Sequence, residues 1–221
     1  MKKLFENRSL LSCAIMMIVI VNTLFSCQDA NLVNVNSIDA PVTSATTDIA
    51  PAVQPYDIFE NFIASGWMGD GKDPQKRYLK LDQSWASQPH SGTSCMKVSY
   101  SPGGPEGFAG IVWQNLPNNW CLSPGEDFSK KGYTTVRFWA RGEKGGEFVR
   151  FKAGGRPCTN GGQYRDSFES KERGYALEKE WKEYIIDITG KNLSSVISGF
   201  CWSASASSSK MEFYLDDVTY Q

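Results

Sequence analysis

The stretch TTVRFWARGEKGGEFVRFKAGG, residues 134–155, contains two segments in which apolar side chains alternate with polar, charged or aromatic ones. Successive side chains of a β-strand point to opposite faces, so the alternation predicts two strands, each with one face toward a core. The Gly-rich loop 142–146 between them predicts that the two strands pair as an antiparallel hairpin. The expected core residues are Val136, Phe138, Ala140, Val149, Phe151 and Ala153.

The opposite face of this predicted hairpin combines aromatic and basic side chains. Trp139 and Phe148 would lie there beside Arg150 and Lys152. Such a surface can stack on a sugar ring and donate hydrogen bonds to its hydroxyl groups. The alternative is a solvated outer sheet face whose charges keep the protein soluble, because single exposed aromatic residues are common on protein surfaces.

Similar short runs fill the rest of residues 56–221. Eight strand-like runs are separated there by Gly, Pro, Ser and Asn, which favours a β-sandwich or jelly roll over an α/β fold. The one stretch with helical character, residues 170–180, contains Gly174, which counts against a long helix. Trp113 and Trp202 are in phase with apolar neighbours and are expected in the core.

The first 26 residues have the pattern of a secretory signal, with a basic start followed by an apolar run over residues 10–25. The run ends in LFSC, residues 24–27, which resembles the lipobox of bacterial lipoproteins and marks Cys27 as the lipid-anchored residue. Residues 28–55 contain no aromatic residue, Lys or Arg, as expected of a disordered tether. We therefore expect an outer-membrane lipoprotein, at the periplasmic face or the cell surface; the alternative is an ordinary signal peptide that leaves Cys27 as an incidental thiol.

The whole chain carries 23 Lys plus Arg residues against 24 Asp plus Glu residues. This near-neutral balance gives no electrostatic reason to expect a nucleic-acid partner, because phosphate binding depends on clustered Lys and Arg. The single His and the scattered Cys residues show no spacing typical of a transition-metal site.

Three motifs, FWARGEKGGE (138–147), WKEYIIDITGKNLSSVISGF (181–200) and FYLDDV (213–218), resemble the carbohydrate-binding modules of the galactose-binding-like jelly-roll superfamily, in a version common on lipid-anchored proteins of Bacteroidetes. The similarity covers nearly all of residues 56–221. It implies an all-β fold of two antiparallel sheets, a concave sheet that often binds glycans, and a structural calcium between the first and last strands. Cys121 departs from the pattern, since Gly is usual at that position.

The resemblance assigns calcium-ligand positions to Glu60, in the expected first strand, and to Asp216, the first Asp of LDD. Calcium prefers hard oxygen donors, with backbone carbonyl groups completing the coordination. In an uninterrupted strand over residues 213–221, Asp217 would point to the opposite face from Asp216 and lie toward the wetter end. The alternatives are a salt bridge or exposure of both carboxylates to water.

Four Cys residues remain in the expected domain, and export places them where disulfides persist. Four Cys residues allow three pairings. Cys121 with Cys158 is the favoured pair, because both fall in loops near the supposed binding face, whereas Cys95 and Cys201 lie in strand-like runs and are expected as small buried thiols.

The leading interpretation is a monomeric, non-catalytic domain that binds a polysaccharide or oligosaccharide. Its expected site consists of Trp139, Arg150 and Lys152 on the sheet with Trp120 and Tyr164 from loops.

The first alternative is a glycoside hydrolase or polysaccharide lyase, and a hydrolase requires a pair of carboxylates. Glu106, Glu147, Asp166 and Glu169 are candidates, but no motif selects two of them. No Ser-His-Asp or Cys-His arrangement is evident around the single His90. The second alternative is a protein-binding module for assembly or adhesion.

Overall fold

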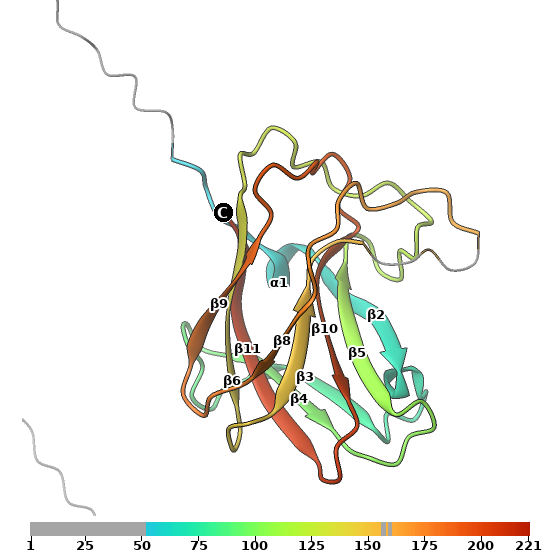
Figure 1. Ribbon diagram of the computed structural model, residues 1–221, viewed down its shortest axis with the longest axis vertical. Coiled ribbons are helices and arrows are strands. Elements are labelled where there is room, and N and C mark those ends of the chain that lie inside the picture. The colour runs from blue at the N-terminus through green and yellow to red at the C-terminus, as the bar shows by residue number, and fades with distance from the viewer. Residues whose placement is uncertain (1–51, 156–157, 159–160) are drawn as a thin grey trace, which may run out of the picture. The chain divides into compact units, whose positions relative to one another are not determined.

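The computed structural model describes residues 52–155, 158 and 161–221 of the chain. Two antiparallel sheets pack face to face (Figure 1). Sheet A has the order β3 (Leu79–Trp85), β4 (Cys95–Tyr100), β11 (Met211–Tyr220), β6 (Thr135–Gly142) and β9 (Lys182–Asp187), with β1 (Tyr56–Asp57) paired to β11. Sheet B has the order β2 (Ile63–Gly69), β5 (Phe108–Gln114), β10 (Ser198–Ser205), β7 (Phe148–Lys152) and β8 (Arg173–Ala176). The predicted all-β sandwich is confirmed.

Helical structure in the described residues is confined to two short elements. They are α1 (Ile58–Asn61) and the 3₁₀ turn η1 (Asp70–Lys72). Neither of these two elements has the length of a membrane-spanning helix. Residues 170–180, the stretch with helical character, instead contain strand β8.

The core lies between the two sheets and is rich in aromatic rings. Phe138 of sheet A and Phe151 of sheet B meet there, with ring centroids 4.6 Å apart. Trp113 and Trp202 are fully buried, as the sequence predicts. Burying a large apolar side chain contributes roughly 1.5–3 kcal/mol relative to leaving it exposed, so this interface is the main source of stability.

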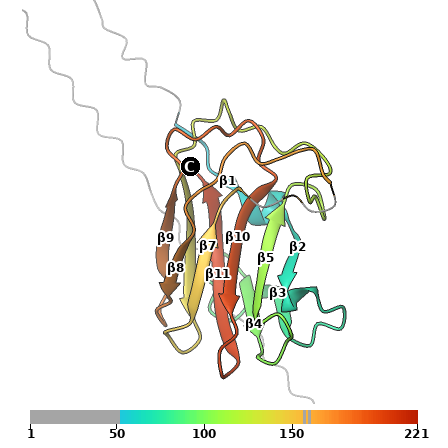
Figure 2. The same ribbon diagram turned by 45° about the vertical axis from the view of Figure 1, so that its right-hand side comes forward.

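The predicted hairpin over residues 134–155 is wrong. Strand β6 pairs with β11 and β9, whereas β7 pairs with β10 and β8, so the loop 142–146 carries the chain from one sheet to the other (Figures 1 and 2). Its ends are held by Gly142 N, which donates to Glu178 O at 2.7 Å, and by Gly146 N, which donates to Leu177 O at 2.7 Å. The alternation correctly predicts which side chains face the core. It does not distinguish two strands that are hydrogen-bonded neighbours in one sheet from two strands that lie in opposite sheets, because both arrangements produce the same alternation.

Two further expectations near the calcium-ligand positions are also wrong. Glu60 lies on α1 rather than on a strand, and its backbone N–H donates to the Asp57 side chain at 3.0 Å as part of the helix cap. In β11 the register shifts between Asp216 and Thr219, and Asp217 has φ 49. This bulge interrupts the alternation, so that Val218 turns into the core and is fully buried.

Candidate binding faces of the two sheets

The outer face of sheet B carries an aromatic ring that a glycine allows to lie close to the strands. Phe148 on β7 is 46% exposed, and its ring covers Gly174 of the neighbouring strand β8. A Cβ atom at position 174 would lie 2.4 Å from Cζ of Phe148. The Arg150 guanidinium lies 5.1 Å from the centroid of the same ring, and its nearest carboxylate contact, to Glu172, is long at 4.0 Å. This face therefore offers an apolar platform with hydrogen-bond donors beside it.

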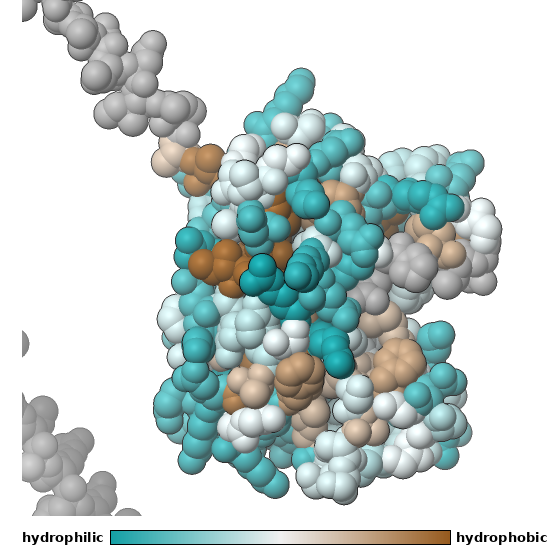
Figure 3. All heavy atoms as spheres, in the orientation of Figure 1, coloured by the Kyte–Doolittle hydropathy of each residue, from teal (hydrophilic) through white to brown (hydrophobic). Residues whose placement is uncertain are grey.

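A cavity of about 430 Å³ adjoins this platform, where the β6–β7 and β10–β11 loops meet. Phe148 and Arg150 both line it, and the charged residues that complete the lining are Lys144, Lys210 and Glu147. Figure 3, in the orientation of Figure 1, shows small apolar patches set among near-neutral and hydrophilic residues on the displayed side of the molecule. The Phe148 platform and the cavity beside it therefore combine apolar stacking area with mainly cationic donors.

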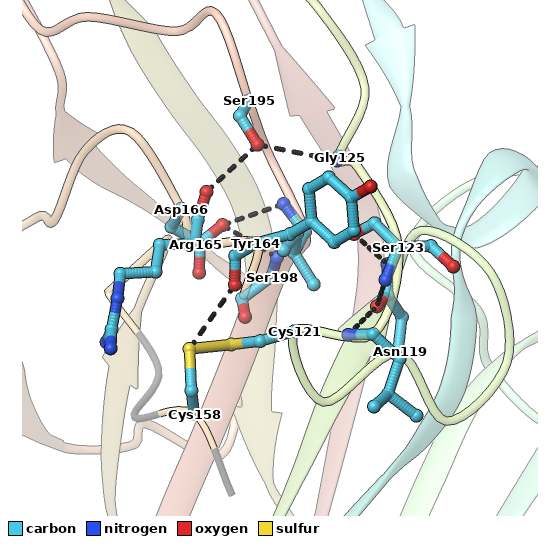
Figure 4. The surroundings of a disulfide bond; sticks show 12 residues. Asn119, Cys121, Ser123, Gly125, Cys158, Tyr164, Arg165, Asp166, Ser195 and Ser198 are labelled. Atoms are coloured by element: carbon cyan, nitrogen blue, oxygen red, sulfur yellow. Dashed lines mark hydrogen bonds between the residues drawn. A yellow bond between two sulfur atoms is a disulfide. The ribbon is translucent and has the colours of Figure 1, made fainter. Parts of the chain in front are cut away.

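A second group of loops, residues 115–125 with 158 and 161–170, lies at the opposite end of sheet B and is joined by a disulfide (Figure 4). The disulfide is the favoured pair, Cys121 with Cys158. Cys121 has φ 66, which lies in the left-handed region that glycine adopts readily. This backbone conformation explains why glycine is usual at this position. The buried Asn119 side chain accepts from Leu122 N and Ser123 N, each at 2.9 Å, and fixes the first loop.

Trp120 and Tyr164 belong to this loop cluster. Tyr164 N donates to Cys121 O at 3.1 Å, and the backbone of Gly162 packs directly on Trp120 and Cys121. Lys152 lies at the same end of sheet B, 9% exposed, with its Nζ paired to Glu169 and donating to Gly155 O at 3.3 Å. The structure therefore brings Trp120, Tyr164 and Lys152 to one end of sheet B. The Lys152 ammonium stabilises the loop that carries Glu169.

Trp139 lies on the outer face of sheet A, apart from Arg150 and Lys152 on sheet B. The prediction that these three residues share one face is wrong, because it rested on the hairpin. The imidazole of His90 stacks on the Trp139 indole, with centroids 3.7 Å apart and an interplanar angle of 15°. One face of the Trp139 ring is therefore already covered.

The two adjacent carboxylates of β11 hold the turn that carries His90. Asp216 Oδ2 accepts from His90 N at 2.9 Å and from Ser91 N at 3.2 Å. Asp217 contacts His90 Nδ1 at 2.6 Å and accepts from the Ser91 hydroxyl at 2.6 Å. Burial raises the pKa of Asp216, and the backbone N–H groups of Ser91, Asp217 and His90 oppose that shift.

Glu60 and Asp216 line the same cavity, which has a volume of about 260 Å³. Its other oxygen-bearing side chains belong to Asp57, Gln83, Ser94 and Asp217, and no Lys or Arg lines it. Hard oxygen donors without a competing cation fit the chemistry of calcium. Among the described residues no three His, Cys, Asp or Glu side chains converge on one metal position. A calcium ion here would thus depend on two carboxylates completed by backbone carbonyl groups and water.

A row of stacked basic and aromatic side chains on the outer face of sheet A was not predicted from the sequence. Lys97 Nζ lies 4.0 Å from the Trp85 ring centroid, and Arg141 Cζ lies 3.9 Å from that of Tyr214. Tyr214 is the direct cross-strand partner of both Lys97 and Arg141. The outward position of each residue is visible in the alternation, but their proximity depends on the order of strands in the sheet.

Three of the four carboxylates considered for hydrolysis, those of Asp166, Glu169 and Glu147, serve structural contacts. Asp166 Oδ1 accepts from Ile197 N at 2.7 Å and from Ser198 N at 2.9 Å, where β10 begins. Glu169 pairs with Lys152, and Glu147 accepts from Lys144 N at 2.8 Å.

Neither a protein-family model nor a curated protein matches this chain. Among solved structures, a family 30 carbohydrate-binding module is similar with a TM-score of 0.52 and 14% identity, over 77% of this chain and 88% of that one. A family 11 carbohydrate-binding module of a cellulosomal cellulase of Clostridium thermocellum is 17% identical with a TM-score of 0.47, over 76% of this chain and 95% of that one.

An exo-1,3/1,4-β-glucanase from a Pseudoalteromonas species is 11% identical with a TM-score of 0.49, over 83% of this chain and only 22% of that one. At these identities the similarity concerns the fold. The described domain has the jelly-roll fold found in carbohydrate-binding modules.

Proposed function

We propose that this protein is a non-catalytic glycan-binding module and that its polysaccharide or oligosaccharide ligand lies on the outer face of sheet B. The observation that carries the proposal is the Phe148 ring, held over Gly174 and 46% exposed, with the Arg150 guanidinium beside it. A pyranose ring can stack on the exposed face of an aromatic side chain while guanidinium N–H groups donate to its hydroxyl oxygens. The fold shared with a carbohydrate-binding module supports this assignment.

The loop cluster would extend the binding face toward the other end of sheet B. Trp120 and Tyr164 are half-buried there, and the disulfide holds their loops together. Lys152 supports the cluster through Glu169 rather than contacting sugar. In this arrangement Phe148 and Arg150 provide the main contacts, and Trp120 with Tyr164 would contact the next sugars of a longer chain.

A glycan array with the protein tests the proposal. Binding to at least one polysaccharide, without release of reducing ends or unsaturated sugars from the same panel, is expected. Absence of binding across plant, algal and host glycans would contradict the binding function. Product release that disappears on substituting one carboxylate would contradict the non-catalytic assignment.

A structural calcium is part of the same proposal. Glu60 and Asp216 would each supply a carboxylate from the cavity that they both line. The ion would join α1, which follows the first described strand, to β11, which is the last one. It would also neutralise negative charge around the buried Asp216. Because the ion would bind only the folded chain, it would stabilise the domain.

The predicted lipid anchor, Cys27, lies outside the described residues. We propose that it tethers the domain to the outer membrane, on the strength of the LFSC ending after an apolar run. Cys27→Ser should release the protein from the membrane fraction. A Cys27→Ser variant that remains in membranes and leaves them only in detergent would contradict the anchor.

A further inference from the structure

Arg141, on β6, is a buried cation without an ionic partner. The residue is 8% exposed, and its Nε has no hydrogen-bond partner. No carboxylate among the described residues lies within ion-pair distance of its guanidinium. Arg137, on the same strand and the same face, instead pairs with Glu183 at 3.0 Å. A buried charge left unpaired is costly, so the contrast between the two arginines needs a physical reason.

Two aromatic rings hold the Arg141 guanidinium in place. Its Cζ lies 3.9 Å from the Tyr214 ring centroid and 5.4 Å from that of Trp181. Each ring is itself fixed, since the Tyr214 hydroxyl donates to Glu143 Oε2 at 2.6 Å and Trp181 Nε1 donates to Gln88 O at 3.0 Å. Cation–π contacts of this kind use the faces of the guanidinium and leave its in-plane N–H donors free.

A cavity of about 330 Å³ lies against this guanidinium. Arg141 and Trp181 line it together with Gln88 and Pro89 of the turn that covers sheet A, and with Lys179 and Glu180. Its charged residues are thus two cations and one anion, to which Glu143 adds a carboxylate near the Tyr214 hydroxyl. Lys179 and Glu180 are exposed, whereas Arg141 lies at the buried side.

We propose that this cavity binds the carboxylate group of an acidic sugar. A planar carboxylate can accept two parallel N–H bonds from a guanidinium, and a fixed guanidinium loses little entropy in making them. The Trp181 indole supplies apolar surface for the attached ring, and the volume lies at the lower end of that of small-ligand sites. The site is on sheet A, so it does not rest on the glycan site proposed for sheet B.

Isothermal titration with D-glucuronate, and with D-glucose as the neutral counterpart, tests this site in the intact protein. Glucuronate should bind and glucose should bind at least tenfold more weakly. Arg141→Met, which keeps the unbranched stem between the rings, should lower glucuronate affinity at least tenfold. Arg137→Met is the matched control on the same strand and should leave it unchanged.

Lys179→Gln, at an exposed position, should lower the affinity about two- to threefold and reduce its dependence on salt. If Arg141→Met does not fold, Arg141→Lys takes its place, because it keeps the charge but loses the two-pronged geometry; tenfold weaker binding is then expected. Equal binding of glucuronate and glucose, or wild-type affinity in a folded Arg141 variant, would overturn the proposal. Phe148→Ala should leave glucuronate binding intact, which separates failure of this site from failure of the glycan face.

Discussion

The outer faces of the two sheets carry similar kinds of residue but differ in what covers them. On sheet A, His90 stacks on Trp139, and Tyr214 lies under Arg141 and is only 2% exposed. On sheet B, Phe148 rests on Gly174 and keeps its other side open to solvent. Aromatic and basic side chains on a strand therefore do not define a glycan site until the loops above them are known.

The loops that lie over the two faces are also held differently. The turn at residues 89–91 is hydrogen-bonded to Asp216 and Asp217, 125 to 126 residues further along the chain. The loop cluster on sheet B is fixed covalently by the Cys121–Cys158 disulfide. Substitution of these two carboxylates should therefore loosen the cover of sheet A, and reduction should loosen the cluster on sheet B.

The largest expected effect concerns the disulfide. It closes a segment with a sequence separation of 37 residues, so its removal should cost about 3–4 kcal/mol in the free energy of unfolding. The double variant Cys121→Ser with Cys158→Ser should show this loss in urea denaturation. Adding a reducing agent to that variant should change nothing further, and an unchanged unfolding midpoint in the variant itself would contradict the account.

Calcium should stabilise the side of the molecule where α1 meets β11. At a free concentration about 100 times the Kd the gain is ~2.7 kcal/mol, which thermal unfolding in calcium against chelator would detect. Asp216→Ala should abolish the difference between calcium and chelator, whereas Asp217→Ala should retain it. Identical melting of the wild type in both conditions would exclude a structural calcium at this cavity.

A smaller effect is expected at Gly174. A methyl group there would meet Cζ of Phe148 and displace the ring, so Gly174→Ala should weaken glycan binding by about 0.5–1 kcal/mol. In a Phe148→Ala background the same substitution should have no further effect on affinity, because the ring that it displaces is gone. Additive losses in the double variant would show that Gly174 acts independently of Phe148.

The smallest effect is a pH dependence from Asp216. Burial raises the pKa of Asp216 in the folded protein. As the pH rises, the Asp216 carboxyl group therefore loses its proton at a lower pH in the unfolded chain than in the folded protein. In chelator, the contribution of Asp216 to stability should be full below its unfolded pKa of about 3.9 and lost as the pH rises through its higher folded value. The difference between wild type and Asp216→Asn should follow this course, and a difference independent of pH between about 3 and 7 would contradict it.

The sequence sufficed for the fold class because burial follows local alternation, as at Phe138 and Phe151. Strands β2 and β3 escaped detection, since a register shift between Ala64 and Gly66 disturbs the alternation of β2 and β3 is largely polar. The disulfide pairing could be predicted from the sequence, because two cysteines fall in expected loops and the other two fall in expected strands. The pairing of the strands could not be predicted, because the local alternation of side chains does not depend on which distant segment a strand is hydrogen-bonded to.

The candidate site shows the same division. Arg150 and Phe148 could be assigned to an outer face from the alternation alone. The placement of Trp139 on the other sheet follows from the pairing of β6 with β11, and its cover by His90 follows from contacts to Asp216 and Asp217. Both depend on long-range contacts.

A neutral glycan should bind at Phe148 on sheet B and not at Trp139 on sheet A, and the affinities of Phe148→Ala and Trp139→Ala for one proven neutral glycan test this assignment most directly. We predict that Phe148→Ala weakens binding by about 1–2 kcal/mol with an unchanged melting temperature, as expected of an exposed anchor residue. Trp139→Ala should leave the affinity within about 0.3 kcal/mol of wild type. A loss in Trp139→Ala together with wild-type affinity in Phe148→Ala would place this neutral glycan at Trp139 and contradict the account.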